Sequence, residues 1–408
     1  MNHIRRALHS AGPILSHGPA VLLLIATGLV AAVLFGLSLQ RPIVVAAEEA
    51  TADPYAGLPS WLPRPVVPDD NQLTAEKVEL GRRLFYDTRL SITGQMSCGT
   101  CHQQARAFTD GRETAIGSTG QIHPRNTMTL TNVAYLPVLT WANPTLTDLE
   151  HQALIPLFGE TPVEQGLAGR ENDLFALFRT DPEYARLFPA SFPEQADPFT
   201  LGTMTRAIAA FERTLISYDS PYDRYRYGRD QGAISDVAKR GEALFFSEDL
   251  ECHHCHGGLN LTDSIRHQRL AFSETAFHNT ALYNVDGRGG YPAPNRGVYE
   301  ISGRAEDMGR FRTPTLRNVV LTAPYMHDGS IPTLDAVLDH YHDGGRTIAD
   351  GPHAGVGSRS PLKDIFLVGF ALSRSDRDAV IAFLQSLTDE GFVHDPRFSD
   401  PFAPHQSE

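Results

Sequence analysis

Two five-residue motifs constrain the fold of this chain more than any other feature of its sequence. Each has the pattern Cys-x-x-Cys-His, in which two thiols can form thioethers to the vinyl groups of a porphyrin and the histidine can ligate its iron. The six residues, which include all four cysteines of the protein, are Cys98, Cys101 and His102 in the first motif and Cys252, Cys255 and His256 in the second. We therefore predict two covalently bound c-type haems.

Other uses of paired cysteines fit the motifs less well. Redox-active dithiols, zinc sites and disulfide frameworks also contain Cys-x-x-Cys pairs, but none of them explains a histidine directly after both pairs. Two further histidines, His253 and His254, lie between the cysteines of the second motif. We expect these two to be spacer residues rather than iron ligands.

The first 47 residues are typical of an export signal. Arg5 and Arg6 precede an apolar run from Ala20 to Leu37, and small residues at Val45-Ala46-Ala47 suit cleavage. An uncleaved membrane anchor is the alternative, because the apolar run is nearly long enough to span a bilayer. Either reading places the folded part of the chain in the periplasm.

The composition is that of a globular, acidic protein. Apolar residues make up 41% of the 408 residues, and the net charge is −13. Because the acidic residues are spread along the chain and haem propionates add to them, we expect no nucleic-acid partner.

An internal repeat indicates two related domains. Residues 81–85, Gly-Arg-Arg-Leu-Phe, precede the first haem motif as residues 241–245, Gly-Glu-Ala-Leu-Phe, precede the second. The segment 127–133 is echoed in the same order by 313–319, and both end in Asn-Val. We assign an export signal or anchor to residues 1–47, a Pro-rich linker or arm to 48–73, cytochrome c-like domains to 74–225 and 226–396, and a tail to 397–408.

Helical periodicity predicts the main elements. A helix over residues 74–86, a long apolar helix from Leu201 to Leu215 and a closing helix capped by Ser375 each present one apolar face. No alternating apolar run is long enough for a substantial sheet. The expected fold is mainly α, with two haem domains related by duplication, long loops and little sheet.

From about Thr74 to Leu387 the chain resembles the bacterial di-haem cytochrome c peroxidases and their MauG-like relatives. Residues 156–164 look most like the branch of di-haem enzymes associated with methanobactin gene clusters, called MbnH. The similarity rests on both haem motifs, Trp141, residues 149–153, Pro156, residues 161–164, residues 313–318 and residues 323–329.

The resemblance implies two unequal haems, of which the first binds peroxide and the second is a six-coordinate electron reservoir. It makes Glu164 the distal carboxylate that moves protons as the O–O bond breaks, and it makes Trp141 the electron relay between the haems. Gln152 and Pro156 correspond to residues that line the distal pocket. Taken without the resemblance, Glu164 would be a solvated loop residue and Trp141 a core residue.

The sixth ligand of the second haem is the most informative position. In the peroxidases a methionine follows the histidine of a Pro-Tyr-x-His stretch, here His327, at a fixed offset. In the MauG-like branch a tyrosine takes that place, and the same offset leads to Tyr341. A phenolate favours high-valent iron, whereas a thioether raises the reduction potential. Met326 is the competing ligand, and Tyr341 could also be an ordinary residue at a helix end.

Two further positions follow from the resemblance. A calcium ion is expected at Asn132 with the backbone carbonyls of Thr322 and Pro324, since hard oxygen ligands suit this cation. Asn132 could equally be a turn residue. His123 lies near the loop histidine that ligates the first haem in resting peroxidases, but it does not match that position, so it could be a pocket or a turn residue.

Three functions are compatible with these residues. The first is a MauG-type oxidase, in which hydrogen peroxide drives a high-valent haem pair that oxidises a tryptophan of a secreted partner protein, with kynurenine as the product. The alternative is a cytochrome c peroxidase that reduces hydrogen peroxide with electrons from a small cytochrome. The third is an electron carrier in which both irons are six-coordinate.

Overall fold

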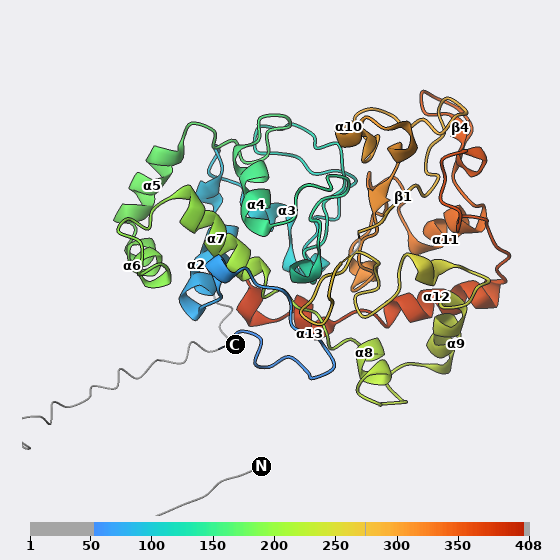
Figure 1. The fold of residues 1–408 in the computed structure, drawn as a ribbon, viewed down its shortest axis with the longest axis horizontal. Helices are drawn as coiled ribbons and strands as arrows, with labels where there is room; N and C mark the ends of the chain where they lie inside the picture. The colour runs from blue at the N-terminus through green and yellow to red at the C-terminus, as the bar shows by residue number, and fades with distance from the viewer. Residues whose placement is uncertain (1–52, 274, 404–408) are drawn as a thin grey trace, which may run out of the picture. The chain divides into compact units, whose positions relative to one another are not determined.

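The computed structural model describes residues 53–273 and 275–403 (Figure 1). The predicted export signal at residues 1–47 lies outside this part of the chain. No described helix is both long enough and apolar enough to cross a membrane.

The described chain is mainly helical, as predicted. The α-helices are α2 (Ala75–Tyr86), α3 (Cys98–Cys101), α4 (Leu149–Phe158), α5 (Glu171–Thr180), α6 (Pro182–Ser191), α7 (Leu201–Glu212), α8 (Pro221–Arg226), α9 (Asp236–Phe245), α10 (Tyr299–Ser302), α11 (Leu334–His342), α12 (Arg374–Gln385) and α13 (Glu390–Val393). Short 3-10 helices occur in the loops, among them η5 (Val133–Tyr135), η6 (Cys252–His254) and η8 (Val319–Leu321).

In the described residues, sheet structure is limited to two short antiparallel ribbons. Strands β1 (Phe277–His278) and β2 (Phe311–Arg312) pair with Phe277 opposite Arg312. Strands β3 (Thr347–Ile348) and β4 (Gly355–Val356) form the second ribbon. This confirms the expectation of little sheet and long loops.

Two glycines at corresponding positions of the repeat allow two pairs of helices to pack at very short distance. Helix α2 packs on α7, and α9 packs on α12. A Cβ atom on Gly81 would lie 1.8 Å from the carbonyl oxygen of Ala207, and one on Gly241 would lie 1.9 Å from that of Ala379. Only glycine permits such an approach between backbones. The repeat found in the sequence is therefore also a repeat of helix packing.

The second part of the repeat forms matched turns. Asn132 and Asn318 both have left-handed backbone conformations, with φ of 58° and 60°, and each is followed by a 3-10 helix, η5 or η8. Both side chains reach Ser217. The amide oxygen of Asn132 accepts the Ser217 N–H at 2.7 Å, and the amide nitrogen of Asn318 donates to the Ser217 hydroxyl at 3.1 Å. The two repeats thus meet at one residue of the chain that connects them.

One predicted helix start is wrong by two residues. Helix α2 begins at Ala75, one residue after the predicted start, and the Thr74 hydroxyl caps it by accepting the Lys77 N–H. The cap of α12 is Ser373 rather than Ser375, because the Ser373 hydroxyl accepts the Asp376 N–H at 3.1 Å. Both serines have an aspartate three residues later, so the sequence pattern alone does not separate them.

The described residues outside the predicted domains pack closely onto them. Tyr55 donates a hydrogen bond to the carbonyl of Arg213, and Tyr135 donates to that of Pro63, so the Pro-rich segment is an arm bound to the core. At the other end, the chain after α12 returns to the helices of the first half (Figure 1). The side chain of Phe398 is buried with those of Phe85 and Phe108. The division at residue 225 stays a prediction.

Candidate haem sites

The histidines of the two motifs have the same hydrogen-bonded arrangement. Nδ1 of His102 lies 2.9 Å from the carbonyl oxygen of Phe108, and Nδ1 of His256 lies 3.2 Å from that of Leu261. A carbonyl only accepts, so each Nδ1 carries the proton and Nε2 is left to ligate a metal. Burial lowers the pKa of both imidazoles, that of His256 to about 4, and keeps them neutral as a ligand must be.

The thiols of the motifs are unsuited to dithiol redox chemistry. Burial raises the pKa of both Cys101 and Cys252 to about 12. Reactive dithiols depend on a thiolate with a lowered pKa. The two sites therefore fit haem attachment better than a redox-active cysteine pair.

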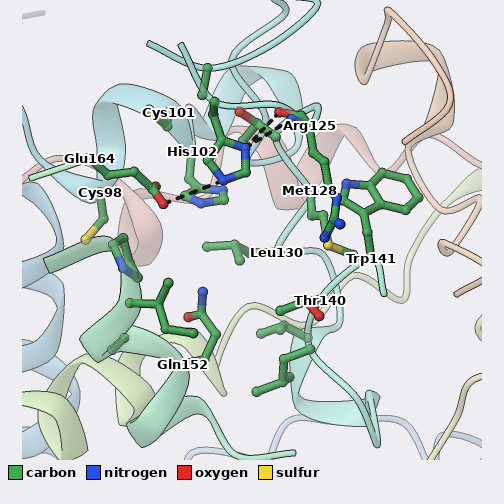
Figure 2. Close-up of a pocket in the computed structure, with 18 of the residues that line it drawn as sticks. Cys98, Cys101, His102, Arg125, Met128, Leu130, Thr140, Trp141, Gln152 and Glu164 are labelled. Atoms are coloured by element: carbon green, nitrogen blue, oxygen red, sulfur yellow. Dashed lines mark hydrogen bonds and ion pairs between the residues drawn. The ribbon is translucent and has the colours of Figure 1, made fainter. Parts of the chain in front are cut away.

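The first motif borders a cavity of about 410 Å³. Its walls include His102, Gln152 from α4, Glu164 and Trp141. Figure 2 shows Glu164 and Trp141 on opposite sides of this cavity. The structure thus brings together the residues that were predicted for the first haem, while their roles stay predictions.

The cavity wall also contains His123, whose role the sequence left open. Nε2 of His123 lies 3.8 Å from Oε1 of Glu164, and Nδ1 of the same ring lies 3.1 Å from the Arg125 N–H and 3.2 Å from the Arg125 carbonyl oxygen. Nδ1 accepts from the first or donates to the second according to the tautomer of the ring. Burial raises the pKa of Glu164, and the nearby His123 lowers it in part. The Glu164 carboxyl consequently holds a proton more readily than an exposed one.

A second cavity, of about 190 Å³, contains the second motif. His256, Met326, His327 and Tyr341 all line it, with Tyr341 near the C-terminal end of α11. Burial raises the pKa of the Tyr341 phenol, so a phenolate at this place needs a cation such as ferric iron beside it. Met326 shares the cavity and remains the competing ligand.

Trp141 borders both cavities. Its indole N–H donates to the carbonyl of Asn126 at 3.0 Å, and its own carbonyl accepts the N–H of Arg312 at 2.8 Å. These bonds hold the ring in the wall that the two sites share. The position suits an electron relay.

Arg312 and His327 provide a test of whether these cavities fit a haem. Arg312 is 2% exposed, and its guanidinium donates to the carbonyls of Thr140 and Thr313 and to the sulfur of Met128. No ion pair joins it to a carboxylate of the described residues, and burial lowers its pKa to about 10, although nearby Asp263 acts in the opposite direction. Nε2 of His327 is also buried, without a hydrogen-bond partner among the described residues. A buried cation without a counter-charge is costly, and a bound haem would bring carboxylates that offset this cost.

Sequence reasoning missed Arg312, and also missed the wall that α10 contributes. The Arg125 guanidinium forms an ion pair with Glu300 of α10 at 2.8 Å, and both residues line the first cavity. A residue from the second half of the chain therefore closes the first site. Arg312 follows Phe311 and directly precedes the repeated segment 313–319, and this position was the available signal for it.

The calcium site at Asn132, Thr322 and Pro324 stays a prediction. Asn132 is fully buried, with its amide oxygen accepting the Ser217 N–H and its amide nitrogen donating to Ser217 and Asn260. It lies in a turn, and Asn318 is its counterpart in the second repeat.

Two cavities, each with two cysteines and a neutral imidazole, define a protein with two c-type haems. The sequence matches the family model for di-haem cytochrome c peroxidase over residues 75–231 and a RoxA-like, cytochrome c-like model over residues 311–343.

Known proteins of the same kind match over most of their length. The methylamine utilization protein MauG of Methylorubrum extorquens is 34% identical over 79% of this chain and 81% of its own. The cytochrome-c peroxidase IdrP1 of Denitromonas iodatirespirans is 34% identical over 90% of this chain and 98% of its own. A crystal structure of a MauG-like protein associated with microbial copper homeostasis is 50% identical, with a TM-score of 0.83 over 85% of this chain and 99% of that one. The chain belongs to the di-haem cytochrome c peroxidase and MauG family, and is a haem-dependent oxidoreductase.

Proposed function

We propose that this protein is a peroxide-dependent oxidase of the MauG type that oxidises a tryptophan on a partner protein, with kynurenine as the product. The observation that carries this proposal is Tyr341, which lines the second cavity together with His256. A phenolate ligand opposes reduction by an ordinary cytochrome donor and favours the storage of oxidising charge.

The chain's own residues suit the peroxide step. When bound, the first haem supplies an iron that binds hydrogen peroxide and takes part in breaking its O–O bond. Glu164 then accepts a proton from the peroxide and returns it to the oxygen that leaves as water. Nε2 of His123 lies 3.8 Å from Oε1 of Glu164, so the imidazole is beside the carboxyl group through both transfers.

The residues between the sites suit electron transfer over a distance. Trp141 lies in the wall common to both cavities, and the Arg312 N–H donates to its backbone carbonyl. A protein substrate does not need to enter either cavity, because electrons can be withdrawn through the surface. We therefore propose a folded partner that presents an exposed tryptophan.

Export would place the reaction in the periplasm and limit its partners to secreted proteins. We propose that the protein acts in the periplasm, on the basis of the N-terminal residues 1–47 and the two haem attachment motifs. The relative associated with microbial copper homeostasis is consistent with a secreted partner from a copper-handling system. A secreted protein encoded next to this one is the first candidate.

Mass spectrometry of the partner tests the proposal. The holoprotein, hydrogen peroxide and the candidate partner are mixed, and the partner's tryptophans are followed in peptide digests. We expect oxidation of one tryptophan that requires peroxide and is lost in Glu164→Gln, whose haem motifs are intact. Unmodified tryptophan with the active holoprotein would contradict the proposal.

A cytochrome c peroxidase is the second candidate, because Met326 also lines the second cavity and several relatives are named as peroxidases. It predicts rapid peroxide turnover with a reduced small cytochrome and a thioether ligand at the second haem. Steady-state oxidation of such a donor distinguishes the two functions.

A further inference from the structure

A group of metal-ligating side chains lies on the second haem motif and outside both cavities. The ligand atoms of Glu248, His253 and His254 all lie within 4.8 Å of one another. Nε2 of His253 is 3.5 Å from one carboxylate oxygen of Glu248, and Nε2 of His254 is 3.8 Å from the other. Nε2 of His254 is also 2.6 Å from the carboxylate of Glu251. The ligand atoms of two imidazoles and of the Glu248 carboxylate therefore converge, while the Glu251 carboxylate contacts His254.

The backbone and an aromatic neighbour hold the two histidines in place. Both belong to the 3-10 helix η6 (Cys252–His254), so the covalent haem attachment at Cys252 and Cys255 fixes their backbone. The ring of His254 stacks on Phe366 with centroids 4.0 Å apart and an angle of 8°. Little conformational freedom is left to be lost when a ligand binds.

The group is accessible to ions from solvent. The side chains of His253 and His254 are 25% and 29% exposed, and that of Glu248 is 80% exposed. Nδ1 of His253 is buried and has no hydrogen-bond partner among the described residues. Stacking on Phe366 explains the position of the His254 ring. It does not explain why the rings of both His253 and His254 lie close to Glu248.

Other surface histidines lack this arrangement. His151 pairs with Asp148 alone, at 2.7 Å, and His394 pairs with Glu390 alone, at 3.5 Å. Within residues 53–273 and 275–403 no other set of three such ligands meets the same distance limit. The cluster is therefore more than a chance pairing of charges.

We propose that Glu248, His253 and His254 bind one divalent transition-metal ion. Imidazole nitrogen together with carboxylate oxygen suits borderline ions such as Cu²⁺ and Zn²⁺ rather than Ca²⁺ or Mg²⁺. The two histidines are the spacer residues between the haem-bearing cysteines, so the ion lies beside the second haem. Its positive charge stabilises the reduced haem and raises the midpoint potential of that haem.

Metal titration of the holoprotein tests the site. Zn²⁺ and Cu²⁺ are titrated separately by isothermal calorimetry, and we expect one ion per chain at this site. Glu248→Gln should weaken its binding about tenfold or more, which corresponds to about 1.4 kcal/mol. Glu248 lies outside the Cys-x-x-Cys-His motif, so its substitution leaves haem attachment intact. His254→Gln is a second variant, whose position lies within the motif.

His151→Gln is the matched control, because His151 is an exposed histidine with a single carboxylate partner. It should bind both ions as the unaltered protein does. Equal affinity and stoichiometry in Glu248→Gln and the unaltered protein would overturn the proposal, as would the same loss in His151→Gln. The unaltered protein, Glu248→Gln and His151→Gln have all their other histidines in common, so binding elsewhere should be the same in the three proteins.

A redox titration tests the position of the ion. Redox-silent Zn²⁺ should raise the midpoint potential of the low-spin haem in the unaltered protein and not in Glu248→Gln. A potential that does not move in either protein would refute the link to the second haem. Neither measurement uses peroxide or a protein partner, so the outcome is independent of the proposed oxidase function.

Discussion

Glu164 and His123 set the pH at which the first site can accept a proton from peroxide. Burial raises the pKa of Glu164 above its ordinary value, and the ionised form is the proton acceptor. The rate of reaction with peroxide should therefore fall as the pH falls through this raised pKa. His123→Gln removes the group that lowers this pKa, so the fall should begin at a higher pH. Stopped-flow absorption of the holoprotein with peroxide across pH measures both curves.

Glu164→Gln should slow the same reaction by about 10²- to 10⁴-fold, the usual contribution of general acid–base catalysis. Glu160→Gln is the control, because Glu160 is an exposed carboxylate in the same loop. A pH profile that is the same with and without His123 would show that the contact to Glu164 has no role in the reaction.

Tyr341 is the residue that distinguishes an oxidase from a peroxidase here. Tyr341→Ala should remove the low-spin ferric species of the second haem, because its sixth ligand is lost. Met326→Leu should leave that species in place. Electron paramagnetic resonance and visible absorption of both ferric variants check this, and the opposite pattern would assign the ligand to Met326.

At the residue scale, the sequence predicted the residues that a motif or the family resemblance identifies. It missed the residues that stand out only because they are buried. The haem cysteines and histidines follow from their spacing, and Glu164 and Tyr341 follow from the family resemblance. Arg312 stands out only because packing buries its guanidinium away from carboxylates of the described residues, which no local pattern records. The contact between the Asn132 amide oxygen and the Ser217 N–H is likewise a result of packing that no local pattern records.

At the level of elements, the two helix crossings depend on glycine. Gly81→Ala or Gly241→Ala places a methyl group against a backbone carbonyl of the partner helix, which has no flexible end that can move aside. Each substitution should destabilise the holoprotein by about 1–3 kcal/mol, the usual cost of overpacking. Thermal unfolding followed by circular dichroism measures the loss.

Gly57→Ala is the control for these variants, because a Cβ at Gly57 meets no atom within 4 Å. Melting temperatures of Gly81→Ala and Gly241→Ala equal to that of the control would contradict the close approach. The sequence predicted the apolar faces of α2 and α12 but not their partners, because periodicity identifies a buried face and not the helix that covers it.

Across the whole molecule, residues of one half of the chain contact the repeats, the cavity and the core of the other half. Ser217 binds Asn132 and Asn318 of the two repeats, Glu300 closes the first cavity, and the chain around Phe398 packs onto the first half. A duplicated sequence predicts two similar units, but it does not predict these contacts between them, which depend on long-range packing.

The shared wall makes Trp141 the residue on which coupling between the haems depends. Trp141→Phe removes the indole N–H bond and the more easily oxidised ring, so the second haem should respond to one equivalent of peroxide at least about tenfold more slowly. Trp61→Phe is the matched control, since Trp61 is the other tryptophan and stacks on Tyr227 with centroids 4.0 Å apart. Rapid-mixing spectra at the second haem compare the two variants, and equal rates in both would rule out a relay at Trp141.

The inequality of the two haems is tested most directly by electron paramagnetic resonance of the resting ferric holoprotein. With the first site open beside Glu164 and the second closed by Tyr341, the spectrum should contain one high-spin and one low-spin signal of equal weight. Two low-spin signals would mean that both irons are six-coordinate, which contradicts a peroxide-binding first haem and fits an electron carrier instead.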